Sequence, residues 1–186
     1  MHPEKKGIRV FGIAESFRKG GKRSALAGIV MRRDLVIDGV SFGSATVSGD
    51  DATDSILRMY DSLERQDVTC MMIGGLVISM YNIVDGERIV ASTGVPIIAV
   101  TYEESDGLEQ NIKGRFDNWQ EKLTLYKKLG SREKIKLRTG KTLFVRCWGL
   151  SQRKAVSILD SFTLQGSLPE PVRVARIAAR SLSAML

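Results

Sequence analysis

The chain has 186 residues, of which 43% are hydrophobic and 26% are charged. This composition excludes a disordered or fibrous protein and is typical of one globular domain, which we expect to span residues 1–186. An excess of 28 Lys and Arg over 21 Asp and Glu gives a formal net charge of +7. A basic surface attracts nucleic acid, although many basic proteins bind none.

The sequence predicts neither a membrane-spanning segment nor a disulfide bond. No apolar run reaches the roughly 18 residues of a membrane span, and the opening M-H-P-E-K-K lacks the apolar core of a signal peptide. Cys70 and Cys147 lie far apart in two apolar runs, a pattern that favours buried free thiols over a disulfide or a metal pair. These features predict a cytoplasmic protein with no membrane partner.

The first part of the chain predicts three strands and a helix. Strand-like runs cover residues 8–14, 24–31 and 35–47, and the polar residues 32–34 suit a hairpin turn. Apolar residues then recur at the spacing i, i+3, i+4 and i+7 of a helix, as Ile56, Met59, Tyr60 and Leu63.

A short apolar run over residues 68–75 predicts a central strand buried on both faces. In open α/β sheets, ligands bind in the groove outside the carboxyl ends of such strands. Here that end carries Gly74 and Gly75, which supply no acid, base or nucleophile. The strand therefore predicts where a site lies but not its chemistry.

The remaining chain predicts a further strand, a hairpin and four helices. We expect helices over residues 76–91, from Phe116 to near Gly130, after Ser151 and after Pro169, and strands over 95–101, 134–137 and 142–147. This order predicts a mixed sheet with helices on both sides.

Several chemistries are excluded by residue type. His2 is the only histidine, so a Ser-His-Asp or Cys-His nucleophile and a histidine-based zinc site are excluded. The stretch Gly20-Gly21-Lys22-Arg23 lacks the earlier glycine and the hydroxyl residue of a Walker loop. Oxygen-ligand chemistry with Mg²⁺ or Mn²⁺ remains.

The candidate carboxylates are Glu15, Asp50, Asp51 and Asp85. Each has a second interpretation that stays open. Glu15 suits a solvated loop, the two acids at 50 and 51 suit the capping of a helix, and Asp85 suits an exposed helix position. The basic residues of the loop 15–23 either contact phosphates or form a solvated hairpin tip; they are Arg18, Lys19, Lys22 and Arg23.

The closing stretch over residues 159–175, with the sequence L-P-E-P-V-R-V-A, resembles the carboxyl end of endonuclease V. Other motifs resemble an archaeal family of endonuclease dU-like proteins related to endonuclease V; they cover residues 38–40, 46–53, 81–85 and 93–97. The resemblance implies an α/β, ribonuclease-H-like fold: a five-stranded mixed sheet flanked by helices, with an extra hairpin and C-terminal helices.

The resemblance also implies a site with core carboxylates. Relatives place an aspartate where this chain has Ala14 and another where it has Gly74, whereas Asp51 is retained and Glu15 follows Ala14. Successive strand residues point to opposite faces of a sheet, so Glu15 replaces the acid at Ala14 only if the strand bends or ends there.

The function implied is a Mg²⁺- or Mn²⁺-dependent endonuclease acting on damaged or deaminated DNA. In that function Glu15 and Asp51 are catalytic and, with Asp85, hold the metal, while the loop Arg18, Lys19, Lys22 and Arg23 contacts phosphate. Losing two carboxylates predicts weak or absent cleavage, because charge and positioning supply most phosphoryl-transfer catalysis. The alternative is an inactive protein that binds nucleic acid or a protein partner.

Overall fold

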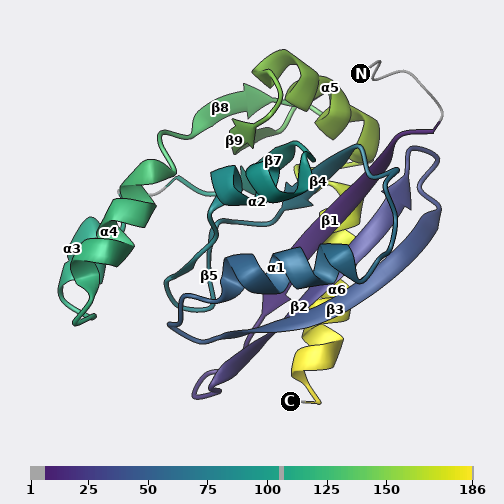
Figure 1. Cartoon of the computed structure of the whole chain (residues 1–186). Coiled ribbons are helices and arrows are strands. Elements are labelled where there is room, and N and C mark those ends of the chain that lie inside the picture. Colours follow the sequence, from purple (N-terminus) through teal and green to yellow (C-terminus); the bar gives the residue numbers. More distant parts are fainter. Residues whose placement is uncertain (1–6, 105–106, 186) are drawn as a thin grey trace.

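The computed structural model describes residues 7–104 and 107–185. His2 and the opening M-H-P-E-K-K lie outside these ranges. In the described part, a seven-stranded sheet has the order β3-β2-β1-β4-β7-β9-β8 (Figure 1). Its strands are β1 (Arg9–Ser16), β2 (Arg23–Arg32), β3 (Ile37–Thr46), β4 (Cys70–Ile73), β7 (Ile97–Thr101), β8 (Glu133–Lys136) and β9 (Thr142–Trp148).

The five strands from β3 to β7 form the predicted mixed sheet. β1, β2 and β3 are a meander of antiparallel neighbours, whereas β4 and β7 run parallel to β1. The hairpin of β8 and β9 then joins β7 in antiparallel pairing and widens the sheet to seven strands. The carboxyl ends of β1, β4 and β7 therefore lie at one edge, where the sequence predicts the site.

Two apolar clusters lie on the two faces of the sheet, and helices cover both. One cluster contains Phe11, Ile13 and Ile56 and lies under α1 (Ala52–Asp61) and α2 (Gly86–Thr93). The other contains Val10, Ala14 and Phe162 and lies under α5 (Gln152–Phe162) and α6 (Glu170–Ser183). Alternate residues of β1 thus enter opposite clusters, as the period of a strand requires.

The helix predicted over residues 76–91 is wrong in its first half. The chain there forms the small antiparallel pair β5 (Val77–Ile78) and β6 (Asn82–Ile83), and α2 begins at Gly86. Ser79, Met80 and Tyr81 make the turn between them, with φ values of 45°, 56° and 74°. Residues other than glycine seldom adopt this left-handed region, so no sequence pattern marks such a turn.

Two helices after β7 form what we call the arm, residues 109–128. They are α3 (Glu109–Lys113) and α4 (Trp119–Lys128), and Figure 1 shows them standing apart from the sheet. The predicted helix begins at Trp119, leaving Phe116 in the connection before it.

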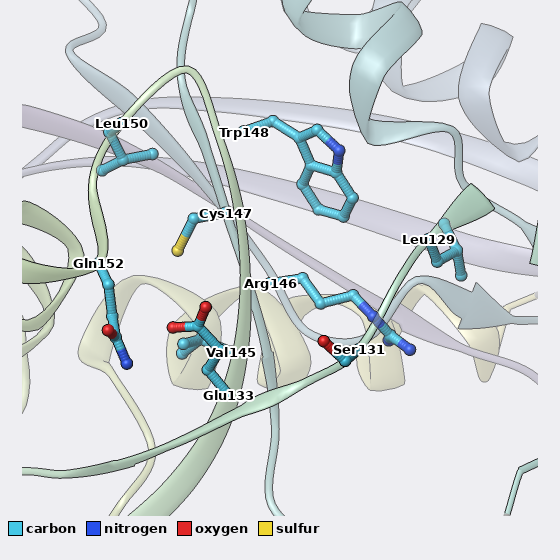
Figure 2. A pocket seen from close by; sticks show the side chains of 9 residues that line it. All are labelled: Leu129, Ser131, Glu133, Val145, Arg146, Cys147, Trp148, Leu150 and Gln152. Carbon is cyan, nitrogen blue, oxygen red and sulfur yellow. The ribbon is translucent and has the colours of Figure 1, made fainter. Parts of the chain in front are cut away.

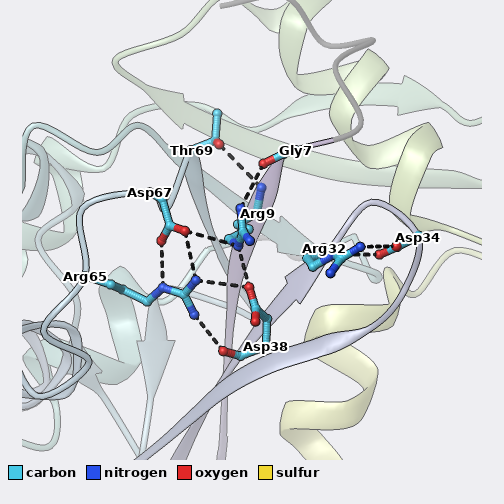
Figure 3. Close-up of polar contacts among 8 residues, drawn as sticks. All are labelled: Gly7, Arg9, Arg32, Asp34, Asp38, Arg65, Asp67 and Thr69. Carbon is cyan, nitrogen blue, oxygen red and sulfur yellow. Dashed lines mark hydrogen bonds and ion pairs between the residues drawn. The ribbon is translucent and has the colours of Figure 1, made fainter.

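An ion-pair network lies at the opposite edge of the sheet, where β1 begins (Figure 3). Arg9 and Arg65 both bind Asp38, the latter at 3.0 Å, and both bind Asp67, at 3.2 and 2.6 Å. Hydrogen bonds from Arg9 and then Arg65 lower the pKa of the Asp38 carboxyl. The motif at residues 38–40 therefore anchors β3 to β1 and takes no part in the predicted site.

Both cysteines are free thiols; Cys70 is buried and Cys147 is half-buried. Within the described ranges, no helix combines the length and apolarity needed to cross a bilayer.

Candidate functional site

Glu15 lies near the end of β1, which continues as a paired strand to Ser16. Ala14 enters the cluster under α6, so Glu15 projects to the α1 face. There its Oε1 accepts hydrogen bonds from the backbone N–H of Ser79, at 3.1 Å, and from the Ser79 hydroxyl, at 3.2 Å. Burial raises the pKa of Glu15, and the two bonds from Ser79 offset only part of that rise.

Asp51 immediately precedes α1, and its carboxylate accepts hydrogen bonds from three donors. Oδ1 accepts from the Thr46 backbone N–H and from the Asn82 side-chain amide, both at 2.8 Å, and Oδ2 accepts from the Thr46 hydroxyl at 2.8 Å. Burial alone would raise the pKa of Asp51, but these hydrogen bonds outweigh it and lower the pKa. Asp51 is thus ionised and joins the end of β3 to β6, without a side-chain hydrogen bond that caps α1.

The turn of residues 79–81 connects the two carboxylates. The carbonyl of Ser79 accepts from the backbone N–H of Ser48 at 2.7 Å, and its hydroxyl lies 2.5 Å from that of Ser24. One residue therefore touches β1, β2 and the segment after β3. Such contacts hold the left-handed backbone of the turn in place against its conformational cost.

Lys122 of the arm reaches the same place. Its side chain is 3% exposed, and its ammonium donates to the carbonyls of Gly49, at 2.8 Å, and Tyr81, at 3.3 Å, and to the carboxylate of Asp50. A buried ammonium requires partners of this kind, because an unpaired one is costly. Lys122 therefore fixes the arm to the two segments that supply Asp51 and Asn82.

Ala14 and Gly74, the positions where the resemblance to endonuclease V implies aspartates, face α6. Ala14 is 5% exposed and packs in the cluster that contains Val172. A side chain at Gly74 would begin 3.0 Å from a Val172 methyl group. A side chain at either position meets the start of α6 on the face opposite Glu15, so Glu15 does not take the place of an acid at position 14.

The predicted metal ligands Glu15, Asp51 and Asp85 are not brought together. Asp85 instead caps α2 by accepting from the N–H of Arg88 at 3.0 Å, and Lys128 lies 3.4 Å from its carboxylate. Across residues 7–104 and 107–185, no three carboxylate, imidazole or thiol groups are placed to share a metal ion. Mg²⁺ usually keeps several waters and is held by one or two carboxylates together with substrate phosphates, so these three residues form no dedicated cage for that ion.

The predicted phosphate-binding residues do lie together. Arg18, Lys19, Lys22 and Arg23 line one hollow of about 440 Å³ with Gly21 and Ser183. Arg23 also donates to Ser44 of β3, which fixes its guanidinium. The lining contains no carboxylate side chain, so the hollow is strongly electropositive. We call residues 17–23 the basic hairpin.

A different hollow, of about 220 Å³, lies beside β9 (Figure 2). Its lining includes Cys147, Trp148, Glu133 and Arg146. Trp148 pairs with Ile97 at the start of β7, so this hollow extends toward the sheet edge opposite the carboxylates. Burial and the nearby Glu133 raise the pKa of Cys147 to about 11, which leaves its thiol protonated and unreactive.

Residues 6–183 match the family described as endonuclease dU. The chain belongs to the endonuclease dU family. UPF0215 proteins of Pyrobaculum calidifontis and Pyrobaculum aerophilum are each 34% identical to it over 168 residues, which is 90% of this chain and 92% and 90% of theirs.

Solved structures show the same fold. A protein of unknown function from Archaeoglobus fulgidus is 23% identical, with a TM-score of 0.81 over 94% of this chain and 98% of its own. Human ENDOV is 18% identical, with a TM-score of 0.65 over 96% and 85%. Endonuclease V of Ciona intestinalis, crystallised with DNA containing an inosine followed by a ribo-adenosine, is 14% identical, with a TM-score of 0.64 over 96% and 87%.

Three residues of this endonuclease dU site were missed from the sequence: Ser79, Asn82 and Lys122. Ser79 carries no signal, because its turn has no glycine. Asn82 lies in the motif at residues 81–85, but only the structure shows its bond to Asp51. Lys122 follows Trp119 by three positions, which places a charge on the apolar face of α4 and is a readable signal.

The pKa of Glu15 gives a pH-dependent prediction. The folded state binds this proton more tightly than the unfolded chain, so stability falls as pH rises above the ordinary value of 4.5. Glu15→Gln keeps an oxygen for Ser79 and removes the charge. We expect its melting temperature to exceed that of the unsubstituted protein by roughly 2–4 °C at neutral pH and to equal it near pH 4.

Thermal unfolding followed by circular dichroism at both pH values measures this difference. A Glu15→Gln protein that melts lower than the unsubstituted protein at neutral pH would show that the ionised carboxylate stabilises the fold.

Proposed function

We propose that this endonuclease dU family member binds nucleic acid, with the phosphate backbone held in the hollow of the basic hairpin. The observation that carries the proposal is the gathering of Arg18, Lys19, Lys22 and Arg23 around one concave surface without a carboxylate side chain. Lys and Arg contacts to phosphate supply most of the affinity for nucleic acid that does not depend on sequence.

A second hollow extends this surface. It has a volume of about 340 Å³ between β3 and α1 and shares Arg23 with the first. Arg58 also lines it, and the guanidinium of Arg58 donates to the Ser55 hydroxyl at 2.9 Å. The two hollows give a polyanion a path from the basic hairpin along β3, the outer strand on that side of the sheet.

Fold similarity supports the same partner. The Ciona endonuclease V, which shares this fold, was crystallised with DNA. In the present chain the basic hairpin follows β1 and precedes β2, so it lies at the sheet edge that carries Glu15 and Asp51. We therefore propose DNA as the first nucleic acid to test.

The proposal is tested by titrating labelled DNA with the protein at several salt concentrations in the presence of a chelator. We expect the logarithm of the association constant to fall linearly with the logarithm of salt concentration, because phosphate contacts release counterions. Binding in chelator would show that it needs no divalent ion, and added Mg²⁺ should weaken it because the ion competes for the phosphates. No binding even at low salt would refute the proposal.

A Mg²⁺- or Mn²⁺-dependent endonuclease for damaged or deaminated DNA is the second candidate. It is favoured by the family description and by the position of Glu15 and Asp51 at the edge where such folds hold ligands. Against it stand the three donors already bound to the carboxylate of Asp51 and the lack, within the described residues, of three groups placed to share a metal ion.

Incubation with inosine- or uracil-containing DNA and either ion tests this candidate. Cleavage that disappears in a Glu15→Ala, Asp51→Ala double variant would establish it, whereas equal product with both proteins would exclude catalysis by these residues.

A further inference from the structure

Two aromatic side chains meet where the arm contacts the turn of residues 79–81, and a third ring, Trp119, lies on the arm beside α3. Tyr81 and Phe116 pack edge to face, with ring centroids 5.6 Å apart, and Trp119 begins α4. None of the three rings is buried. The nucleic-acid interactions proposed above leave all three unused.

Cations accompany each ring. The guanidinium of Arg115 lies 5.7 Å from the centre of Tyr81, and the ammonium of Lys113 lies 5.9 Å from the centre of Trp119. Both cations are exposed to solvent. The third ring, Phe116, is covered by the buried Lys122 at 4.9 Å. The result is a surface on which rings alternate with positive charges.

The backbone that presents Tyr81 is strained. Three consecutive non-glycine residues in the left-handed region are conformationally costly, and strain of this kind concentrates at ligand-binding elements. The carbonyl of Tyr81 is bound by Lys122, so the turn and the arm form one unit. The backbone that carries Tyr81 is thus tied to the arm in the free protein.

The rings lie at the same edge of the molecule as the basic hairpin. The carbonyl of Lys22 accepts from Val47 at 2.9 Å, and the hydroxyl of Ser24 meets that of Ser79, next to the aromatic turn. A continuous series of contacts therefore leads from the basic hairpin through the turn to the arm.

We propose that Tyr81, Phe116 and Trp119, with Lys113 and Arg115, form a stacking site for unpaired bases of a single-stranded nucleic acid. This inference rests on the proposed nucleic-acid binding and specifies its substrate as single-stranded. Every base offers a flat face to an aromatic ring, whereas bases in a duplex already stack on one another. Stacking combined with a basic groove is how proteins hold single strands without reading their sequence.

The test compares Trp119→Leu with the matched variant Trp119→Phe in the full chain. Leucine preserves apolar packing but lacks a ring face, and phenylalanine keeps one. The probes are an oligothymidylate strand and a duplex of the same length, each titrated in chelator by fluorescence anisotropy. We expect Trp119→Leu to bind the single strand about tenfold more weakly and the duplex with unchanged affinity.

Trp119→Phe is expected to bind the single strand within about twofold of the unsubstituted protein, since a ring face remains. Equal single-strand affinity for Trp119→Leu and the unsubstituted protein would overturn the inference, as would an equal loss for strand and duplex. Either result leaves hairpin-mediated binding standing. Failure of the unsubstituted protein to bind either probe would instead refute the proposed function itself.

Discussion

Replacing Arg18, Lys19 and Lys22 together by serine is expected to reduce DNA affinity by at least about a hundredfold at low salt. Each lost phosphate contact lowers the slope of log affinity against log salt concentration by about one, so the slope should fall by about three. Arg23 is left in place because its guanidinium holds Ser44 of β3. Anisotropy titrations across a salt series measure both quantities.

A charge-matched control separates the hairpin from the overall charge of the protein. Serine at Arg33, Arg153 and Lys154 removes the same charge from the opposite edge of the sheet, where the turn after β2 and the start of α5 lie. This variant should keep the slope of the unsubstituted protein. An equal loss of affinity in both variants would mean that net charge, and not the hairpin, governs binding.

Gly12→Ala is expected to destabilise the fold by about 3 kcal/mol, at the upper end of typical overpacking costs. A methyl group there would lie 2.4 Å from the backbone carbon and the Cβ of Pro171, where α6 crosses β1. Neither backbone yields easily, because β1 is a central strand and Pro171 begins a helix packed on it. For a chain of this size the melting temperature should fall by roughly 6–12 °C.

Gly114→Ala is the matched control, because an added methyl group there meets only the carbonyl oxygen of Gln110, at 3.6 Å. Its stability should stay within about 0.5 kcal/mol of the unsubstituted protein. Thermal and urea unfolding of both variants measure the difference. A Gly12→Ala protein as stable as the Gly114→Ala protein would contradict the close packing of α6 on β1.

Much of the fold could be predicted because its signals are local. The polar residues 32–34 mark the turn between β2 and β3, and the spacing of Ile56, Met59 and Tyr60 marks α1. The apolar run that contains β4 marks the centre of the sheet, as its neighbours β1 and β7 show. Each of these patterns depends only on burial and on the period of the element.

The site could be predicted only in part, because its contacts join distant segments. The four residues of the basic hairpin are close in sequence and line one hollow, as a short hairpin requires. Glu15 is held by Ser79 of the turn at residues 79–81, and that turn is left-handed without glycine. Contacts from Ser24, Ser48 and Lys122 hold this turn in place. Of the three residues, only Lys122 has a local sequence signal, as a charge on the apolar face of α4.

The chain has no side chain at Gly74, directly after β4, and the structure shows which face of the sheet such a side chain would occupy. Side chains at Gly74 and Ala14 would point toward Val172 of α6 and not toward Glu15. Glu15 and Asp51 lie on hydrogen bonds of their own. Glu15 accepts from Ser79 of the turn, and Asp51 joins the end of β3 to β6.

Lysine acetylation footprinting, with single-stranded DNA in chelator and mass-spectrometric readout, tests the location of binding most directly. The account predicts that DNA protects Lys19 and Lys22 in the hollow of the basic hairpin, while the exposed Lys154 at the start of α5 reacts as fast as without DNA. Protection of Lys154 with full reactivity at Lys19 and Lys22 would contradict it.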